Sequence, residues 1–365
     1  MAEWIECSIG DLCDTISDTY RGNDEQVVLI NTSDVLEGKI LNRTPVDNKN
    51  LKGQFKKTFR KNDILYSEIR PANKRFAFVD IEDTSNYIAS TKLMVLRAKK
   101  GVLPEFLFAI LKSNTIVTEL QMLAETRSGT FPQITFSSEL APMKIMLPDM
   151  DTQQRIVNVL SSIEGKIENN TAINNNLAEQ MLSLFKNQFS YVLQGSDNTL
   201  ESLIDFSNGK KRPIEDGNIP VYGGNGILAY TNKSNSSNCI VIGHVGAYCG
   251  NVFLSTNDCW ISDNAIQGKC KISKSQLFAY MLLKNAELPS RHIGTGQPLM
   301  TQGILNSIPC SIPPIEDILK FNEICTPLQI TIENNYAEND NLSTIRDTLL
   351  PKLMSGELNV SEINI

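Results

Sequence analysis

Two long segments of the chain place apolar residues at the seven-residue spacing of paired α-helices. The segments cover residues 153–190 and 316–354. In the first segment the two heptad positions hold Ile156, Ile163, Asn170, Leu177 and Leu184, and Leu160, Ile167, Asn174, Met181 and Gln188. In the second they hold Phe321, Leu328, Asn335, Leu342 and Leu349, and Cys325, Ile332, Asn339, Arg346 and Leu353. A sustained apolar seam of this kind predicts two long helices that pack as a coiled coil.

The two helical segments are parts of one internal repeat. Pro148 aligns with Pro313, an offset of 165 residues, and the same offset superposes the Glu-Asn-Asn motifs at 168–170 and 333–335. Matches further upstream pair Gly129-Thr130 with Gly294-Thr295, and Thr135 with Thr301. An internal period of this length indicates a duplicated domain rather than a solenoid.

Upstream of each helical segment, strand-like runs precede one short apolar helix. The runs NDILYSEI and RFAFVDI in the first half, and SNCIVIGH and GNVFLST in the second, favour β-strands. The segments PEFLFAILKS and SQLFAYMLLKN favour a helix. The pattern therefore predicts an α+β fold with two mixed α/β domains. The predicted boundaries are a first domain at 1–150, a long helix at 151–193, a second domain at 194–313, a long helix at 314–358 and a tail at 359–365.

Both helical segments place two asparagines at interior heptad positions near their middles. If the helices pack antiparallel, these polar layers meet, and a slipped register would deprive an asparagine of its partner. Four residues are therefore predicted to fix the helix register: Asn170, Asn174, Asn335 and Asn339. The alternative is that they lie on a solvated surface. Pro327 lacks an amide hydrogen, so it predicts a kink or a fresh helical start in the second segment only.

Composition and charge narrow the class of protein. The chain has 365 residues, of which 41% are hydrophobic and 21% charged, as in globular proteins of two to three domains. No apolar run approaches the roughly 18 residues that a membrane helix needs. The start MAEWIECSIGDL has neither the basic region nor the apolar stretch of a signal peptide. We therefore expect a cytoplasmic protein.

Eight cysteines are present, but none forms a C-x-x-C pair. Cys239, Cys249, Cys259 and Cys270 have near-regular spacing, which would suit a metal site. The favoured interpretation is that each is a small apolar residue in a separate strand of one sheet, because zinc sites usually take closely spaced ligands.

The net charge of −7 at first counts against a nucleic-acid partner. The charge is uneven, however: between Lys39 and Arg75 there are eleven Lys or Arg against three acids, a net +8. A local patch acts over about a Debye length, so it outweighs the total. A solvated surface is the alternative for any such run, and the patch gains meaning only in context.

In the order of its elements, the chain resembles the specificity subunit of type I restriction–modification systems, over essentially its whole length. The marks of this resemblance are LPDMDTQQRIVNVLSSIEGKIENN, the matching IPPIEDILKFNEICTPLQITIENN and the closing LLPKLMSGEL at 349–358. The second half adds GKKRPIEDGNIPVYGGNGILAY at 209–230 and GTGQPLMTQGILNSIPCSIP at 294–313.

The resemblance implies two target-recognition domains in pseudo-two-fold repeat, separated by two long antiparallel coiled-coil helices. Each domain would read one half of a split, asymmetric target in double-stranded DNA. The implied partners are two modification (methyltransferase) subunits and restriction (translocase and nuclease) subunits, with no membrane. S-adenosylmethionine, ATP and Mg would belong to those partners, so no cofactor, metal ligand or catalytic residue is expected here. In agreement, the chain has no G-x-x-x-x-G-K-[ST] loop and no Asn-Pro-Pro-aromatic motif.

Candidate DNA contacts divide into phosphate contacts, which give affinity, and base contacts, which give specificity. The phosphate candidates of the first half are Lys56, Lys57, Arg60 and Lys61. Arg70, Lys74 and Arg75 follow a strand and could enter a groove, since arginine can bind guanine bidentately. Arg127 and Thr130 are further candidates, in a flexible loop that is rich in hydrogen-bond donors. The candidates of the second half are Lys210, Lys211, Arg212, Tyr222, Asn225, His244, Tyr248, Arg291, His292 and Gln297. For each single residue, a surface position without DNA contact is the alternative.

Two of these candidate groups are expected in corresponding loops. His244 and Tyr248 should lie in the loop that matches 70–75, and 291–297 should match 127–130.

Three other functions stay open. The chain could be the recognition subunit of a type II-like or other phage-defence methyltransferase. A standalone nuclease would need a carboxylate–lysine cluster, and no such constellation is evident in the sequence. A coiled-coil adaptor would bind proteins through its globular halves, and the +8 stretch argues against it.

Overall fold

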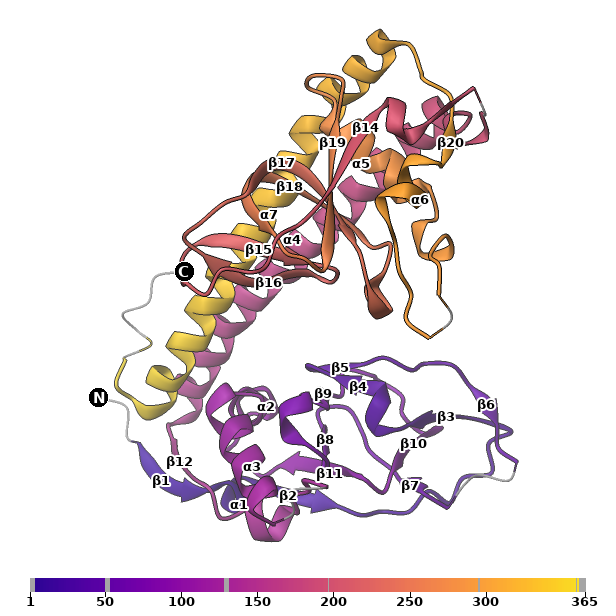
Figure 1. Cartoon of the computed structure of the whole chain (residues 1–365). Coiled ribbons are helices and arrows are strands. Elements are labelled where there is room, and N and C mark those ends of the chain that lie inside the picture. Colours follow the sequence, from indigo (N-terminus) through magenta and orange to yellow (C-terminus); the bar gives the residue numbers. More distant parts are fainter. Residues whose placement is uncertain are drawn as a thin grey trace. The chain divides into compact units, whose positions relative to one another are not determined.

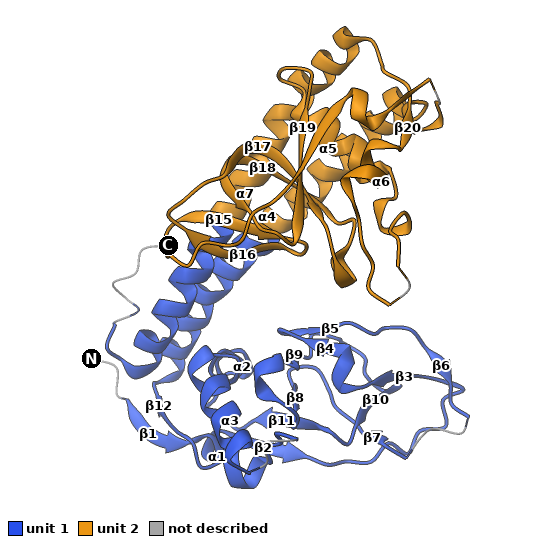
Figure 2. Cartoon of the chain, viewed as in Figure 1, with its two compact units in different colours: residues 1–169, 338–365 blue, residues 170–337 orange. Residues whose placement is uncertain are grey.

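The computed structural model describes residues 4–49, 53–127, 131–195, 197–294, 296–358 and 360. They form two compact units, 1–169 with 338–365 (unit 1) and 170–337 (unit 2), which Figure 2 shows in different colours. Each unit contains one mixed α/β domain and part of each long helix, α4 (Met150–Phe189) and α7 (Ile315–Ser355) (Figure 1). The units thus cut across the predicted boundaries, which treated the helices as separate domains.

Unit 1 contains two four-stranded sheets, with the strand orders β2-β11-β8-β9 and β6-β3-β10-β7. Its strands are β1 (Ile5–Ser8), β2 (Cys13–Ile16), β3 (Gln26–Ile30), β4 (Val35–Leu36), β5 (Lys39–Ile40), β6 (Val46–Asp47), β7 (Phe55–Lys57), β8 (Ile64–Ser67), β9 (Phe76–Phe78), β10 (Tyr87–Ser90), β11 (Leu93–Ala98) and β12 (Lys144–Leu147). Its helical elements are α1 (Ile9–Leu12), η1 (Thr32–Asp34), η2 (Pro71–Asn73), α2 (Pro104–Leu111), α3 (Asn114–Arg127) and the π-helical turn η3 (Phe136–Leu140).

Unit 2 contains one six-stranded sheet with the order β14-β19-β17-β18-β15-β16. Its strands are β13 (Asn198–Thr199), β14 (Ile204–Asn208), β15 (Ile219–Gly223), β16 (Gly226–Thr231), β17 (Ser236–Gly243), β18 (Val252–Ile261), β19 (Ala265–Cys270) and β20 (Pro309–Cys310). Its helical elements are η4 (Val192–Gln194), η5 (Leu200–Ser202), η6 (Gly246–Tyr248), α5 (Gln276–Asn285), η7 (Leu288–Ser290) and α6 (Gln302–Asn306).

Each domain contains an equivalent four-stranded antiparallel sheet, the shared sheet, and its residues pair in the same register in both domains. The order β2-β11-β8-β9 of unit 1 corresponds to β14-β19-β17-β18 of unit 2. The equivalent residue pairs are Cys13–Ala98 and Ile204–Cys270, Ser67–Leu93 and Gly243–Ala265, and Ile64–Phe78 and Ile240–Leu254. The duplication that the sequence shows in the helices therefore extends through the domains, where side chains have diverged and main-chain pairing has not.

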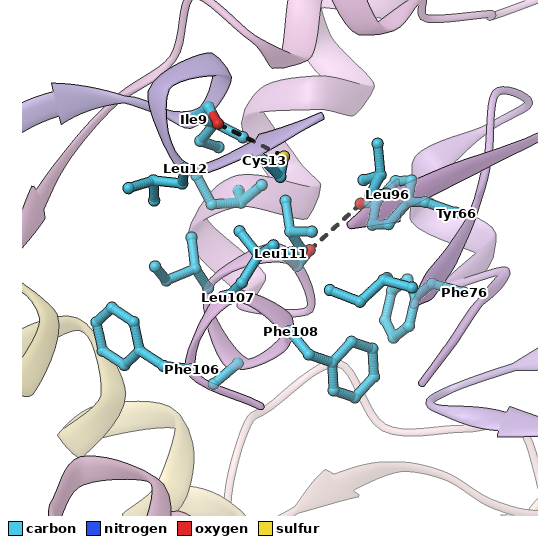
Figure 3. Packing of buried hydrophobic residues seen from close by; sticks show 14 of the residues in the cluster. Ile9, Leu12, Cys13, Tyr66, Phe76, Leu96, Phe106, Leu107, Phe108 and Leu111 are labelled. Carbon is cyan, nitrogen blue, oxygen red and sulfur yellow. Dashed lines mark hydrogen bonds between the residues drawn. The ribbon is translucent and has the colours of Figure 1, made fainter. Parts of the chain in front are cut away.

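The short helix of unit 1 covers one face of this sheet. Pro104 begins α2 at a position where the missing N–H is not needed, and all residues from Phe106 to Leu111 are buried. Below the helix, Tyr66 stacks on Phe76 with ring centroids 5.4 Å apart, and its hydroxyl donates to the carbonyl of Leu111 at 3.4 Å (Figure 3). Buried residues of α4 and α7 belong to the same cluster, so the domain and this part of the helix pair form one core.

Aromatic side chains join the domain of unit 2 to its part of the helix pair. Phe185 and Phe189 of α4 contact Phe278 of α5 and Phe321 of α7, with ring centroids 5.0 to 6.5 Å apart. All four side chains are almost completely buried. Burial of one such side chain contributes about 1.5–3 kcal/mol, so this cluster is a main source of stability in unit 2.

The second long helix does not restart at Pro327. α7 continues without interruption from Ile315 to Ser355, so of the two expectations at Pro327, a kink or a fresh start, the fresh start was wrong and the kink stays a prediction. A proline removes only one helical hydrogen bond, and the neighbouring Cys325 and Leu328 are held in the core of unit 2. Among the described residues, no helix is long and apolar enough to cross a membrane.

The paired asparagines lie inside the helix pair rather than on a wet surface. In unit 2 the Asn335 amide donates to Oδ1 of Asn174 at 2.8 Å, and the Asn174 amide donates to the carbonyl of Ile332 at 3.2 Å. In unit 1 the Asn339 amide donates to the Ile167 carbonyl at 3.4 Å.

The burial of the asparagine side chains and the relative direction of the two helices agree with these contacts. Asn170 and Asn174 are 1% and 2% exposed. The helices run antiparallel within unit 2, since Asn174 meets Asn335 whereas Phe185, farther along α4, meets the earlier Phe321. That the asparagines fix the register stays a prediction.

Replacing Asn174 with alanine should lower the free energy of unfolding by about 1–3 kcal/mol, because the buried Asn174 amide is removed and the half-buried amide of Asn335 loses its acceptor. Urea unfolding followed by circular dichroism measures the change. Asn175→Ala, at the exposed neighbouring position, is the matched control and should change little. The double variant Asn174→Leu/Asn335→Leu should recover stability, because both polar partners are removed together. Equal effects at 174 and 175 would contradict a structural role for the polar layer.

Candidate nucleic-acid interface

Two loops of unit 1 are joined by main-chain hydrogen bonds at one end of the shared sheet. The first loop, 68–75, follows β8, and the second ends in 131–134. The amide of Arg70 donates to the carbonyl of Pro132 at 3.1 Å, and the amide of Ile134 donates to the carbonyl of Glu68 at 2.8 Å. The loops are therefore held by backbone atoms, which leaves their side chains available for contacts.

Unit 2 repeats this loop pair atom for atom. The amide of Gly246 donates to the carbonyl of Pro298 at 2.9 Å, and the amide of Met300 donates to the carbonyl of His244 at 2.8 Å. One residue beyond each pair, Thr135 and Thr301 cap the next helical turn with their hydroxyl oxygens. The predicted match of the first loops is confirmed for Tyr248, which lies opposite 70–75, whereas His244 is equivalent to Glu68, two residues before that range.

A third loop approaches the first in each unit. In unit 2 the turn at 222–226 is so close that a Cβ on Gly224 would lie 3.6 Å from the Cα of Gly243 and 3.7 Å from the Cβ of Tyr248. The predicted residues Asn225 and Tyr248 are therefore neighbours, and both are exposed. The half-buried Tyr222 begins this turn, and burial raises the pKa of its phenol.

In unit 1 the corresponding approach uses an arginine. Arg75 donates from Nη1 to the carbonyls of Ser33 at 3.1 Å and Val35 at 3.4 Å. The guanidinium of Arg75, a predicted groove candidate, thus joins the first loop to η1 and β4.

The basic run of unit 2 lies at the same end of its sheet. The amide of Lys210 donates to the carbonyl of Ile261, and the amide of His244 donates to the carbonyl of Asn264. Both contacts are made in the turn that joins β18 to β19. Lys210, Lys211 and Arg212 are exposed there, next to the loop that carries Tyr248.

The four phosphate candidates of unit 1 do not form one cluster. Lys57 is half-buried and donates from Nζ to the carbonyl of Leu93 at 2.8 Å, and burial lowers its pKa. Lys61 pairs with Glu82, and with Arg60 it lies before β8, at the opposite end from the first loop. Lys56 is exposed, and among the described residues its side chain has no partner, so it fits the predicted phosphate contact better than Lys57 or Lys61.

The basic stretch at 39–75 has less unpaired positive charge than its number of Lys and Arg residues suggests. Four of its bases form ion pairs with acids that lie outside it: Lys39 with Glu168, Arg43 with Asp80, Lys61 with Glu82, and Lys74 with Glu37. Among the described residues, four exposed bases of the stretch have no ion pair or side-chain hydrogen bond: Lys49, Lys56, Arg60 and Arg70. These four are the described bases of the stretch whose side chains are most available to an outside ligand.

Several other candidates are engaged within the protein. Arg127 pairs with Glu139 at 3.1 Å. Arg291 donates from Nε to the carbonyl of Ala286 at 2.7 Å. The Nδ1 atom of His244 contacts the carbonyl of Met300. These three side chains brace the loops, whereas Gln297 is exposed on the second loop.

His292 and Thr130 differ from the other candidates. Nδ1 of His292 is buried without a hydrogen-bond partner in the described part of the chain. Thr130 lies outside the described residues.

Two exposed bases of unit 1 are absent from the candidates that the sequence suggested. Arg21 lies beside β7, directly after Tyr20, whose amide donates to the carbonyl of Lys56. Lys92 lies beside the first loop, in the turn between β10 and β11; its carbonyl accepts from the amide of Glu68 at 3.0 Å, and its Nζ pairs with the Glu68 carboxylate at 3.7 Å. Neither lies in a basic run, so only the register of the sheet identifies them.

The cysteines behave as packing residues. The sulfurs of Cys239 in β17 and Cys259 in β18 are 3.5 Å apart, and both side chains are buried. Cys270 lies in β19, but Cys249 lies in the β17–β18 loop, so the expectation of four separate strands was wrong for that residue. Within the described ranges, no group of His, Cys, Asp and Glu could hold a metal ion.

The comparison with known proteins matches both halves of the repeat. The profile of the type I restriction modification DNA specificity domain matches residues 1–179 and 199–342. The specificity subunit of the HindI type I restriction enzyme from Haemophilus influenzae is 47% identical over 191 residues, 52% of this chain and 41% of that subunit. The chain thus aligns with less than half of that relative's length. The MjaIX specificity subunit from Methanocaldococcus jannaschii is 25% identical over 316 residues, 73% of this chain and 71% of that subunit.

Solved structures agree at the level of the fold. The S subunit of a type I restriction-modification system from M. genitalium has a TM-score of 0.58 and 19% identity, covering 97% of this chain and 96% of that one. A chain from a type I R-M system has a TM-score of 0.51, also at 19% identity, covering 97% and 98%. Because the family profile covers most of the chain, on both sides of its internal repeat, the chain belongs to the family of type I restriction modification DNA specificity domains.

Proposed function

We propose that this chain is the DNA-reading subunit of a type I restriction–modification complex. One observation carries the proposal: the two units contain the same pair of hydrogen-bonded loops, and the two copies carry different side chains. Equivalent main-chain bonds hold Arg70 in one copy and Gly246 in the other. Two readers of this kind suit a bipartite target whose halves differ in sequence, because base edges are distinguished by side chains.

The chemistry of the loop surfaces supports DNA as the ligand. Exposed bases lie at this end of both sheets, including Arg70 in unit 1 and Lys210, Lys211 and Arg212 in unit 2. Exposed Tyr248, Asn225 and Gln297 add hydrogen-bonding groups beside them. Bases next to neutral polar groups are the combination that binds phosphates and reads base edges. A cytoplasmic site of action follows from this ligand.

We further propose that the reactions take place on partner subunits. The chain would direct two methyltransferase subunits, which use S-adenosylmethionine, and restriction subunits, which use ATP and Mg, to the target. The relatives from Haemophilus influenzae and Methanocaldococcus jannaschii support this role, since both are specificity subunits of type I restriction enzymes. The helix pair is the part of the chain that repeats most closely in sequence, which suits a surface that meets two copies of one partner.

Co-expression with its methyltransferase partner should yield methylated adenine in a two-part motif with a gap of unspecified bases. Methylated-base sequencing of the host DNA measures this. Cells that express the methyltransferase without this chain are the control and should lack the motif. A continuous motif, or the same motif without this chain, would rule out the proposed role.

Transfer of residues 209–310 into another specificity subunit should change one half of its motif only. The reason is that each unit has its own loop framework and its own core. The same sequencing experiment reads the result. Changes in both halves would contradict two independent readers.

Lys56 and Lys57, neighbours on β7, should respond differently to alanine. Lys56→Ala removes an exposed charge, so the slope of log affinity against log salt should fall by about 0.9 if it meets a phosphate. Lys57→Ala removes a half-buried donor to the carbonyl of Leu93 and should mainly lower the melting temperature. Binding of the assembled complex to target DNA between low and moderate salt, together with thermal melts, tests both. Identical salt slopes for Lys56→Ala and wild type would exclude a phosphate contact.

A further inference from the structure

Arg70 has a backbone conformation that normally belongs to glycine. Its φ angle is +45°, in the left-handed region, at the start of η2. A residue with a Cβ is strained in this region, and such residues concentrate at ligand sites. Arg70 is therefore at a position that its own side chain disfavours.

The second copy shows what the fold itself requires at this position. The residue equivalent to Arg70 is Gly246, with φ of +77°. The equivalence rests on two bonds: both amides donate to a proline carbonyl, and both carbonyls accept from the residue three positions on, Asn73 or Cys249. A Cβ built on Gly246 meets no heavy atom within 4 Å. Glycine is thus needed there for its conformation and not for space.

Nothing within the described part of the protein explains why unit 1 has arginine instead. The guanidinium of Arg70 has no ion pair and no hydrogen bond among the described residues, and the side chain is exposed. Arg75 of the same loop differs, because it donates to two carbonyls and so supports the fold. A strained residue that supports nothing inside the protein points to a contact outside it.

Lys74 is a second left-handed residue in the loop, but it is less diagnostic. Its φ is +51°, and at the corresponding place in unit 2 stands Gly250, with φ of +83°. Gly250 has an additional reason to be glycine, since a Cβ there would lie 2.6 Å from the nitrogen of Pro289. Lys74 also has a partner, Glu37, at 3.7 Å. Arg70 is therefore the left-handed residue of this loop whose side chain has no role within the described residues.

We propose that Arg70 is a specificity-determining residue that reads a guanine in the DNA half-site bound by unit 1. This rests on the proposed function, which supplies DNA as the ligand. Bidentate contact with O6 and N7 of guanine needs a guanidinium of fixed direction, whereas a phosphate accepts a charge from many directions. Main-chain bonds at Arg70 and at Glu68 hold the backbone that carries this side chain, so the point from which the guanidinium reaches the DNA is fixed.

The test uses the complex of this chain with its methyltransferase and compares Arg70→Ala with Arg70→Gly. Both variants remove the guanidinium. One guanine position in a single half-site should become degenerate, with the preference for guanine falling about 10- to 100-fold. The other half-site is the internal control, and its unchanged methylation shows that the complex has assembled. Arg70→Gly should melt at a higher temperature than Arg70→Ala, because only glycine relieves the strain.

Gly246→Ala is the matched control for strain. It adds a Cβ at the equivalent position, where there is room, and should lower the melting temperature. The proposal would be overturned if the wild-type half-site of unit 1 contained no G·C pair, or if both Arg70 variants left the motif unchanged. Uniformly weaker binding with a lower salt slope and an unchanged motif would also overturn it, because it would indicate a phosphate contact. A melting temperature of Arg70→Gly no higher than that of Arg70→Ala would exclude the strain on which the proposal depends. Failure of the proposed function would differ from all of these, because the wild-type complex would then show no two-part motif.

Discussion

Burial of the apolar seams of α4 and α7 against the domain of the same unit holds each unit together. In unit 1 the seam shares a core with α2 and one face of the sheet. In unit 2 four phenylalanines, two from α4 and one each from α5 and α7, make the same kind of junction. Because this packing fixes the sheet, it also fixes the loops that leave the end of the sheet, and those loops form the candidate interface.

A comparison of the two copies distinguishes the main-chain contacts that both keep from the loop side chains that differ between them. Sheet register, the bonds between the first and second loops, and the threonine caps all use main-chain atoms or one small hydroxyl. Main-chain bonds do not depend on side-chain identity, so the loops can change their residues while they keep their positions. Arg70 and Gly246 are the clearest case, since one backbone conformation carries two unlike residues.

The sequence predicted the regions of the interface better than its individual residues. Its loop match between 244–248 and 70–75 is confirmed for Tyr248 by equivalent hydrogen bonds. Its grouping of Lys57 and Lys61 with Lys56 and Arg60 as phosphate contacts stays a prediction, and the structure adds that Lys57 reaches the carbonyl of Leu93 and Lys61 pairs with Glu82. A count of charges along a chain cannot include partners that are distant in sequence.

The sequence by itself determined the repeat, the two long helices and the mixed α/β class of each domain. These follow from periodicity, which is local, and from the alignment of the chain with itself. Only the tertiary structure decided that α7 passes through Pro327, that Asn174 and Asn335 share a hydrogen bond, and that Lys92 lies beside Glu68 of the first loop. Each of these depends on contacts between residues far apart in the chain, and their free energies appear only after the elements have packed.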